Sequence, residues 1–130
     1  MVDKKRGVSP GYSLASRTAA LGCALRGITV LLRQPNARIH AVAACVATGL
    51  GATFKISVFE WVALVLVIGA VVTAEALNTA LELAVDLAEP EWHALARDAK
   101  DVAAGGVLVS SIAAVIVGLL IFVPNFKAWL

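Results

Sequence analysis

Residues 61–86 of the chain read WVALVLVIGAVVTAEALNTALELAVD. An apolar run long enough to cross a membrane ends here in a polar segment. In an α-helix, at about 100° per residue, positions spaced by three, four and four residues share one stripe. The polar residues of this segment have that spacing: Glu75, Asn78, Glu82 and Asp86. Ionisable groups are costly in a membrane helix, so we interpret the stripe as a functional site.

The alternative for such a stripe is a polar seam that joins helices through hydrogen bonds. A lone Asn78 would favour that alternative. The three carboxylates repel one another, and no basic residue shares the stripe with them. A cation that offsets this repulsion is therefore part of the interpretation.

The composition is that of a membrane protein. Of the 130 residues, 60% are hydrophobic and 15% are charged, whereas apolar residues make up about 45–50% of a typical globular domain. The hydropathy pattern predicts an all-α integral membrane protein with three transmembrane helices. We expect the spans at about residues 36–54, 58–87 and 98–124.

The residues before the first span predict a different kind of helix. Over about residues 12–33, apolar residues recur at helical spacing, and Arg26 and Arg33 lie off the apolar face. This pattern favours an amphipathic helix on the membrane surface. We expect residues 1–11 to be a mobile basic tail, and no cleaved signal peptide, because no apolar segment follows directly. Residues 12–130 then form one membrane domain.

The distribution of basic residues predicts the orientation. With three spans, the N-terminal segment up to Arg38 and the second connection, residues 88–101, share one side, and nine of the eleven Lys and Arg residues lie there. By the positive-inside rule this side is cytoplasmic. The acidic stripe then opens toward the compartment that holds ATP and free Mg²⁺.

The second connection adds the groups that phosphoryl transfer requires. Lys100 and Asp101 adjoin the third span, and we expect them to face Asp86 at the same depth. A lysine for phosphate oxygens and carboxylates for a metal are the usual parts of such a site. The sequence has no glycine-rich phosphate loop and no protein-kinase signature, so a nucleotide must bind through Mg²⁺ and scattered cations.

We expect two carboxylates of the stripe to have different roles. Glu75 lies deepest in the apolar run, away from water, which suits a general base that takes a proton from an alcohol. Glu82 lies two turns nearer the cytoplasm, roughly 10 Å along the axis. One helix can thus position a lipid hydroxyl at depth and a metal-bound phosphate above it.

Residues 75–86 (EALNTALELAVD) and 99–108 (AKDVAAGGVL) closely resemble the prokaryotic diacylglycerol kinase family, which includes undecaprenol kinases. Residues 36–40 (NARIH) are similar to the family segment before the first span. The resemblance runs from about residue 21 to 122. It implies a homotrimer with active sites shared between protomers, in the bacterial inner membrane with the sites on the cytoplasmic side. It also implies phosphoryl transfer from MgATP to a membrane lipid alcohol.

The resemblance also implies roles for individual residues. Glu75 matches the catalytic base, and Glu82 matches a metal-binding carboxylate. Gln34 stands where the family often has a second metal-binding Glu, so the metal is held more weakly or another carboxylate substitutes. The implied nucleotide-binding residues are Lys100, Asp101, Glu82, Asn78, Asp86, Trp92, His93 and Arg17. The implied lipid-binding residues are Glu75, Arg38 and Asn36.

The identity of the lipid rests on finer similarity. Asp86-Leu87 and the segment from Lys100 look more like the branch that phosphorylates undecaprenol, so we expect undecaprenyl phosphate as the product. The alternative is a diacylglycerol kinase that makes phosphatidic acid. A more distant alternative is a non-enzymatic membrane subunit whose acidic stripe binds ions. We expect no nucleic-acid partner.

Overall fold

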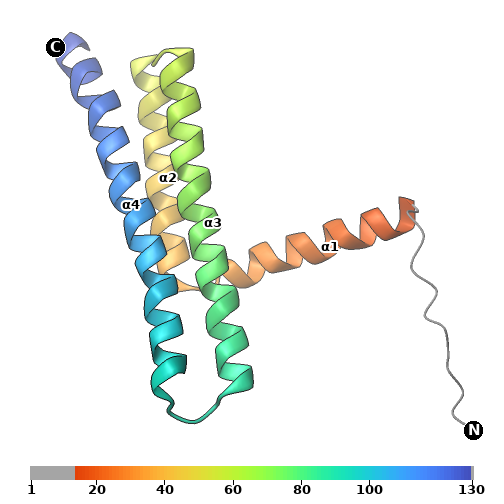
Figure 1. The fold of residues 1–130 in the computed structure, drawn as a ribbon. Helices are drawn as coiled ribbons and strands as arrows, with labels where there is room; N and C mark the ends of the chain where they lie inside the picture. The colour runs from red at the N-terminus through yellow and green to blue at the C-terminus, as the bar shows by residue number, and fades with distance from the viewer. Residues whose placement is uncertain (1–13, 130) are drawn as a thin grey trace, which may run out of the picture. The chain divides into compact units, whose positions relative to one another are not determined.

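The computed structural model describes residues 14–129 and contains four α-helices (Figure 1). They are α1 (Leu14–Leu31), α2 (Pro35–Phe54), α3 (Val58–Ala88) and α4 (Ala94–Trp129). No β-strand occurs in this part of the chain. The expected tail, residues 1–11, and the first residues of the expected surface helix lie outside the described range. The chain divides into one unit that ends at Val30 and another that begins at Leu31, and each is described by itself.

The first unit contains most of α1. Its larger apolar side chains, Leu21, Leu25 and Ile28, are exposed, and so is Arg26. The helix ends at Leu31, whose carbonyl accepts a hydrogen bond from the Gln34 amide. Pro35 follows, and a residue before proline avoids the helical region. A position on the membrane surface stays a prediction for α1.

In the second unit α2, α3 and α4 run side by side, with α2 and α4 antiparallel to α3 (Figure 1). All three helices are long and apolar enough to cross a membrane. This confirms the prediction of an all-helical fold with three membrane-length helices. Pro35 stands at the first position of α2, where its missing amide hydrogen is harmless. Pro90 follows the end of α3 for the complementary reason, because proline cannot continue a helix.

The fourth helix is longer than the expected span, which ended at residue 124. It continues through Pro124 to Trp129. Proline removes one backbone hydrogen bond from a helix, but neighbouring polar side chains in membrane helices often compensate. Here the Asn125 side chain donates to the Ile121 carbonyl at 2.8 Å, beside the carbonyl that Pro124 leaves without its usual partner.

Polar contacts at both ends fix the register of α3 against α4. At one end Asn125 Nδ2 donates to Glu60 Oε1 at 2.7 Å. Glu60 also completes a capping box with Ser57 at the start of α3. At the other end Lys100 binds Asp86. These pairs are 26 residues apart along α3, or roughly 39 Å at 1.5 Å per residue. The depth of each polar residue between them is thereby set.

Close packing joins α2 to the start of α3. Gly51 is buried on α2 beneath Ile56 and Trp61. A Cβ atom at Gly51 would lie 3.0 Å from both Ile56 Cδ1 and Trp61 Cη2. Glycine is therefore required here for the helices to approach.

We expect Gly51→Leu to destabilise the second unit by about 1–3 kcal/mol, because the larger side chain overpacks this contact. Thermal unfolding of the purified protein in detergent measures the effect. Gly49→Leu is the matched control, since a Cβ at Gly49 meets nothing within 4 Å. Equal melting temperatures for the two variants would contradict the packing described for Gly51.

Candidate active site

The polar stripe of α3 is buried at its deep end. Glu75 is 2% exposed and Asn78 is 6% exposed, whereas Leu77 and Leu81 face outward. Apolar side chains toward lipid and ionisable ones toward the protein interior are the normal arrangement for functional residues in membranes. Exposure rises along the stripe, and the Asp86 side chain is 63% exposed. The stripe thus runs from a dry interior to an open surface.

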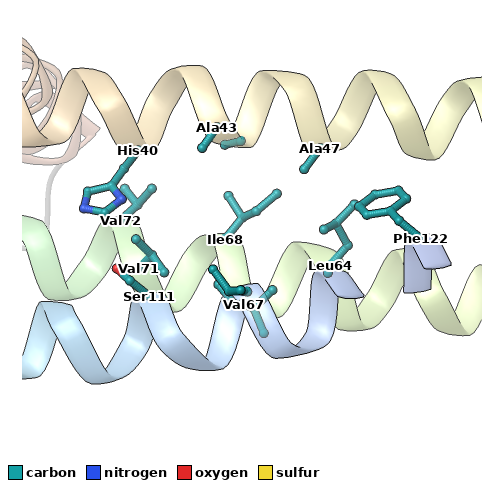
Figure 2. Close-up of a pocket in the computed structure, with 14 residues that line it drawn as sticks. His40, Ala43, Ala47, Leu64, Val67, Ile68, Val71, Val72, Ser111 and Phe122 are labelled. Atoms are coloured by element: carbon teal, nitrogen blue, oxygen red, sulfur yellow. The ribbon is translucent and has the colours of Figure 1, made fainter. Parts of the chain in front are cut away.

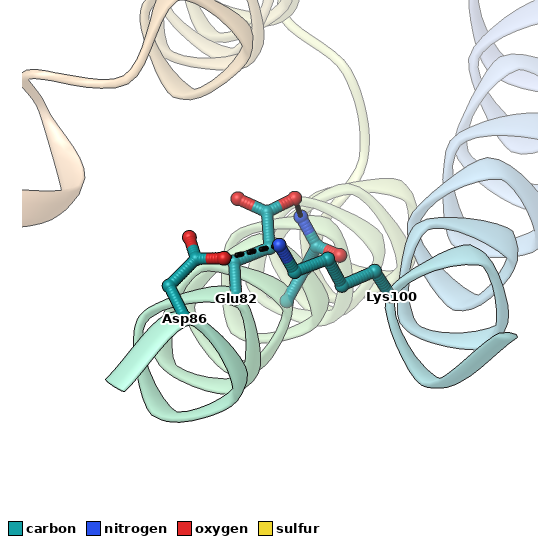
Figure 3. Close-up of polar contacts among 4 residues, drawn as sticks. Glu82, Asp86 and Lys100 are labelled. Atoms are coloured by element: carbon teal, nitrogen blue, oxygen red, sulfur yellow. Dashed lines mark hydrogen bonds and ion pairs between the residues drawn. The ribbon is translucent and has the colours of Figure 1, made fainter. Parts of the chain in front are cut away.

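Hydrogen bonds hold the outer part of the stripe in place (Figure 3). Asn78 Nδ2 donates to Glu82 Oε1 at 3.0 Å, one helical turn away. Lys100 Nζ, from α4, donates to Asp86 Oδ1. The amide therefore orients one carboxylate, and the ammonium group lies at the depth of the next. Lys100 and Asp86 are brought together by the pairing of α3 with α4.

Two atoms of the inner part lack a partner. Glu75 Oε2 and Asn78 Oδ1 are buried and accept no hydrogen bond within residues 14–129. A buried polar atom without a partner costs about 1–3 kcal/mol, and such atoms in native proteins call for an explanation. Both point to a group that one chain does not supply, such as a substrate, an ion or a neighbouring protomer.

The connection from α3 to α4 forms a polar pocket with a volume of about 320 cubic ångströms at the outer end of the stripe. Its lining includes four carboxylates and two basic side chains, a formal charge of −2. The charged residues are Asp86, Glu89, Glu91, Asp101, Arg97 and Lys100. A polyphosphate enters such a pocket only together with cations.

Trp92 and His93, also expected to bind the nucleotide, line the same pocket. Trp92 is 80% exposed and presents a free aromatic face. His93 Nδ1 accepts a hydrogen bond from the Leu95 amide at 3.2 Å, so its ring caps the start of α4. The first turn of α4 faces the pocket, and amide groups at a helix N-terminus favour anions.

Arg97 was not assigned to the site from the sequence, although it lines this pocket. Its Nε lies 3.5 Å from Asp101 Oδ2. The spacing of four residues between them was the signal for this pair. Arg97 offsets part of the charge of Asp101, which leaves Lys100 paired with Asp86.

The remaining predicted residues lie elsewhere. Gln34 precedes α2 as its N-cap. Arg38 Nε donates to the Leu32 carbonyl at 2.9 Å, and Asn36 is exposed. His40 and Val72 line one pocket, and the same antiparallel register puts Gln34 level with Asn78. Arg17 is exposed on α1 in the first unit, and its nucleotide role stays a prediction.

The side chains of this site offer few oxygen ligands for Mg²⁺. Within residues 14–129, no three His, Cys, Asp or Glu side chains gather in a metal-binding group. Mg²⁺ takes oxygen ligands, however, and with nucleotides it is often held by one or two carboxylates together with phosphates and water. Glu82, oriented by Asn78, suits this minimal role, and the Gln34 carbonyl group is chemically compatible with it.

Comparison with known proteins accounts for this combination of residues. The family model for prokaryotic diacylglycerol kinase matches residues 22–122. The chain belongs to this family. The match confirms the resemblance drawn from the polar stripe and from the segment after Lys100. The chain is therefore a membrane kinase, and the alternative of a non-enzymatic ion-binding subunit is set aside.

Two relatives have specific names. The chain is 44% identical over 101 residues to undecaprenol kinase of Bacillus subtilis, covering 77% of this chain and 82% of the relative. It is 36% identical over 118 residues to diacylglycerol kinase of Synechocystis sp., covering 90% of this chain and 65% of the relative. Both relatives are named as lipid kinases, in agreement with the family.

Proposed function

We propose that this member of the family uses MgATP to phosphorylate undecaprenol, giving undecaprenyl phosphate and ADP. The observation that carries the choice of lipid is the 44% identity to an undecaprenol kinase over 82% of that protein. In the reaction the lipid oxygen bonds to the γ-phosphorus, and the bond from that phosphorus to the β–γ bridging oxygen breaks. The electron pair of that bond leaves with ADP, and the hydroxyl proton is removed.

Glu75 takes that proton. Its carboxylate is buried and its Oε2 accepts no hydrogen bond from residues 14–129, so the atom is free to accept one from a lipid hydroxyl. A base within hydrogen-bonding reach contributes about 10²–10⁴-fold to such a reaction. The proton then passes to water when the product leaves. The burial of Glu75 also keeps competing water away from the phosphoryl group.

The outer part of the stripe binds the nucleotide. Lys100, Asp101, Trp92 and His93 line the polar pocket with Asp86, and Asn78 and Glu82 continue inward from it. When ATP binds, the Lys100 ammonium group releases the Asp86 carboxylate and binds phosphate oxygens instead. Glu82 would hold Mg²⁺, with Gln34 as a neutral second ligand. Bound there, the ion would supply positive charge against the phosphates in a pocket whose own lining is negative.

We propose a homotrimer whose active sites are completed by neighbouring protomers. The unpartnered atoms of Glu75 and Asn78 support this assembly. Light scattering of the detergent-solubilised protein measures the assembly. A protein mass of three chains is expected, and a mass of one or two chains would contradict the trimer.

We also propose that the protein lies in the bacterial inner membrane with the active site on the cytoplasmic side. The predominance of Lys and Arg before α2 and in the first two turns of α4 supports this orientation. The amphipathic α1 then lies in the same interface, and residues 12–130 work as one domain. A reporter fused after residue 130 should be active outside the cytoplasm, and cytoplasmic activity would reverse the topology.

The second candidate substrate is diacylglycerol, which the Synechocystis relative favours. Purified protein in mixed micelles, supplied with ATP labelled at the γ-phosphate, distinguishes the two lipids when each is offered separately. Labelled undecaprenyl phosphate is expected at the higher rate. Label transfer to diacylglycerol alone would replace our choice of lipid and leave the kinase assignment intact.

Gln34 offers a test of the metal site. We expect Gln34→Glu to lower the Mg²⁺ concentration for half-maximal rate on the order of tenfold, because it adds a charged ligand. Gln34→Leu, which removes the oxygen ligand, should raise it. The measurement is the initial rate against Mg²⁺ concentration at fixed ATP. Unchanged Mg²⁺ dependence in both variants would place Gln34 outside the metal site.

A further inference from the structure

Two polar side chains lie inside the membrane fold without a role in the proposed reaction. They are His40 of α2 and Ser111 of α4, and both line a second pocket, the apolar pocket, which α2, α3 and α4 enclose (Figure 2). Its volume is about 290 cubic ångströms. Figure 2 shows His40 and Ser111 at one end of the pocket and Leu64 and Phe122 at the other. Polar groups at such a depth call for an explanation.

Ser111 lies at the depth of Glu75. The antiparallel helices α3 and α4 are joined by the pair of Asp86 with Lys100. Glu75 lies 11 residues before Asp86 on α3. Ser111 lies 11 residues after Lys100 on α4. Counted from the polar pair at the other end of α3, the separations are 15 and 14 residues. Equal separations along antiparallel helices place Glu75 and Ser111 at one level.

The Ser111 hydroxyl lacks the partner that a serine in a membrane helix normally has. Such a hydroxyl usually donates to the carbonyl group one turn earlier, and Ser110 does so, to Gly106 at 2.9 Å. Ser111 Oγ is buried and forms no hydrogen bond within residues 14–129, and the same is true of Glu75 Oε2. A hydroxyl group both donates and accepts, so it can pair with either form of a carboxyl group.

His40 lies less than one turn from the same level. Gly51 of α2 packs beneath Trp61 of α3, and His40 lies 11 residues before Gly51. Val72, which also lines the pocket, lies 11 residues after Trp61 and is therefore level with His40. Val72 precedes Glu75 by three residues, roughly 4.5 Å along the axis. His40 is only partly buried and belongs to the second turn of α2, so it lies near the membrane surface.

The burial of Glu75 creates a need for a proton route. Glu75 is 2% exposed, and bound substrates exclude water further. A base that stays protonated cannot accept the next hydroxyl proton. Of the described residues that line the apolar pocket, His40 is the only titratable one, and α4 adds no charged residue to this lining. Histidine is also the side chain best suited to exchange protons near neutral pH.

We propose that Ser111 and His40 form a proton relay that returns Glu75 to its carboxylate form after each phosphoryl transfer. The inference rests on the proposed lipid-kinase reaction and adds the step that resets its base. Protonated Glu75 donates its hydrogen to Ser111 Oγ, and Ser111 donates its own hydrogen to the unprotonated nitrogen of His40. The imidazolium group then gives a proton to water at the membrane surface. All three side chains end as they began, and one proton has moved to water.

Transient kinetics separate a relay from a structural contact. The first turnover starts from unprotonated Glu75 and does not need the relay, whereas every later turnover does. We expect His40→Gln to keep the first turnover within about twofold of wild type and to lower the steady-state rate about tenfold. Rapid-quench measurement with γ-labelled ATP and undecaprenol in micelles then shows a burst of one product per active site. A wild-type steady-state rate, or a first turnover slowed as much as later ones, overturns the relay.

Serine variants provide the matched controls. Ser111→Ala should give the same burst as His40→Gln, whereas Ser111→Thr keeps the hydroxyl and should keep the wild-type steady-state rate. Ser110→Ala is the control, because Ser110 is adjacent on α4 and its hydroxyl is bound to Gly106. It should change neither phase. A burst in Ser110→Ala, or none in Ser111→Ala, contradicts the proposal.

Chemical rescue tests His40 in a second way. His40→Ala removes the ring from the pocket wall and leaves space for a small base. We expect imidazole in the buffer to raise the steady-state rate of this variant about fivefold and to leave its first turnover unchanged. Absence of rescue overturns the relay. If wild-type protein phosphorylates undecaprenol but His40→Gln shows no burst, this inference fails alone. If wild-type protein phosphorylates no lipid alcohol, the proposed function fails.

Discussion

Glu75→Gln should lower kcat for lipid phosphorylation by about 10²–10⁴-fold. The amide keeps the size and the hydrogen-bonding geometry of the side chain but cannot accept the hydroxyl proton. Because Glu75 has no ion-pair partner in residues 14–129, the substitution leaves no charge uncompensated in one chain. ATP affinity, Mg²⁺ dependence and oligomeric state should therefore stay close to those of the wild type.

Single-turnover phosphorylation in mixed micelles measures this effect apart from product release. Glu60→Gln is the matched control, since it makes the same change on the same helix at the opposite end. Glutamine at position 60 can still accept from Asn125 and complete the capping box with Ser57. Full activity of Glu75→Gln would remove Glu75 as the base.

Lys100→Met should lower kcat by about 10²–10³-fold, the usual effect of removing one group that stabilises charge in a transition state. Of the two basic side chains that line the polar pocket, Lys100 is the one nearer to the stripe. The substitution removes its charge and leaves Asp86 without its partner. The lining of the pocket then changes from a formal charge of −2 to −3. KM for ATP should rise as well, because the phosphates meet a more negative surface.

The control for Lys100→Met is Lys127→Met, which removes the same charge from the other end of α4. Adding Asp86→Asn to Lys100→Met restores the charge balance, so it should recover part of the ATP affinity but not kcat. Wild-type kcat in Lys100→Met would show that Lys100 acts only as the structural partner of Asp86.

The membrane fold could be predicted from hydropathy alone, because each span contains a long and mostly apolar run. The end of α4 could not. The expected span ended at residue 124, and the hydrogen bond from the Asn125 side chain to the Ile121 carbonyl depends on side-chain geometry. The pairing of Asn125 with Glu60 is likewise a long-range contact with no local signal. The arrangement of α1 on the membrane and the trimer stay predictions.

The part of the candidate site whose residues share one helix could be predicted from the sequence. The spacing of Glu75, Asn78 and Glu82 fixes their common stripe whatever else the fold does. Ser111 and His40 were missed as pocket residues, because the apolar pocket needs three helices to form. The signals available were a hydroxyl in an otherwise apolar span and a histidine just inside another. Neither indicates a partner without the structure.

Phosphorylation of undecaprenol by the purified protein is the claim on which the other proposals depend. The most direct test offers undecaprenol and diacylglycerol together in one micelle, with labelled ATP and Mg²⁺. We predict that labelled undecaprenyl phosphate forms in large excess over labelled phosphatidic acid. An excess of phosphatidic acid would contradict the choice of substrate, and absence of both products would contradict the assignment of a lipid kinase activity to this chain.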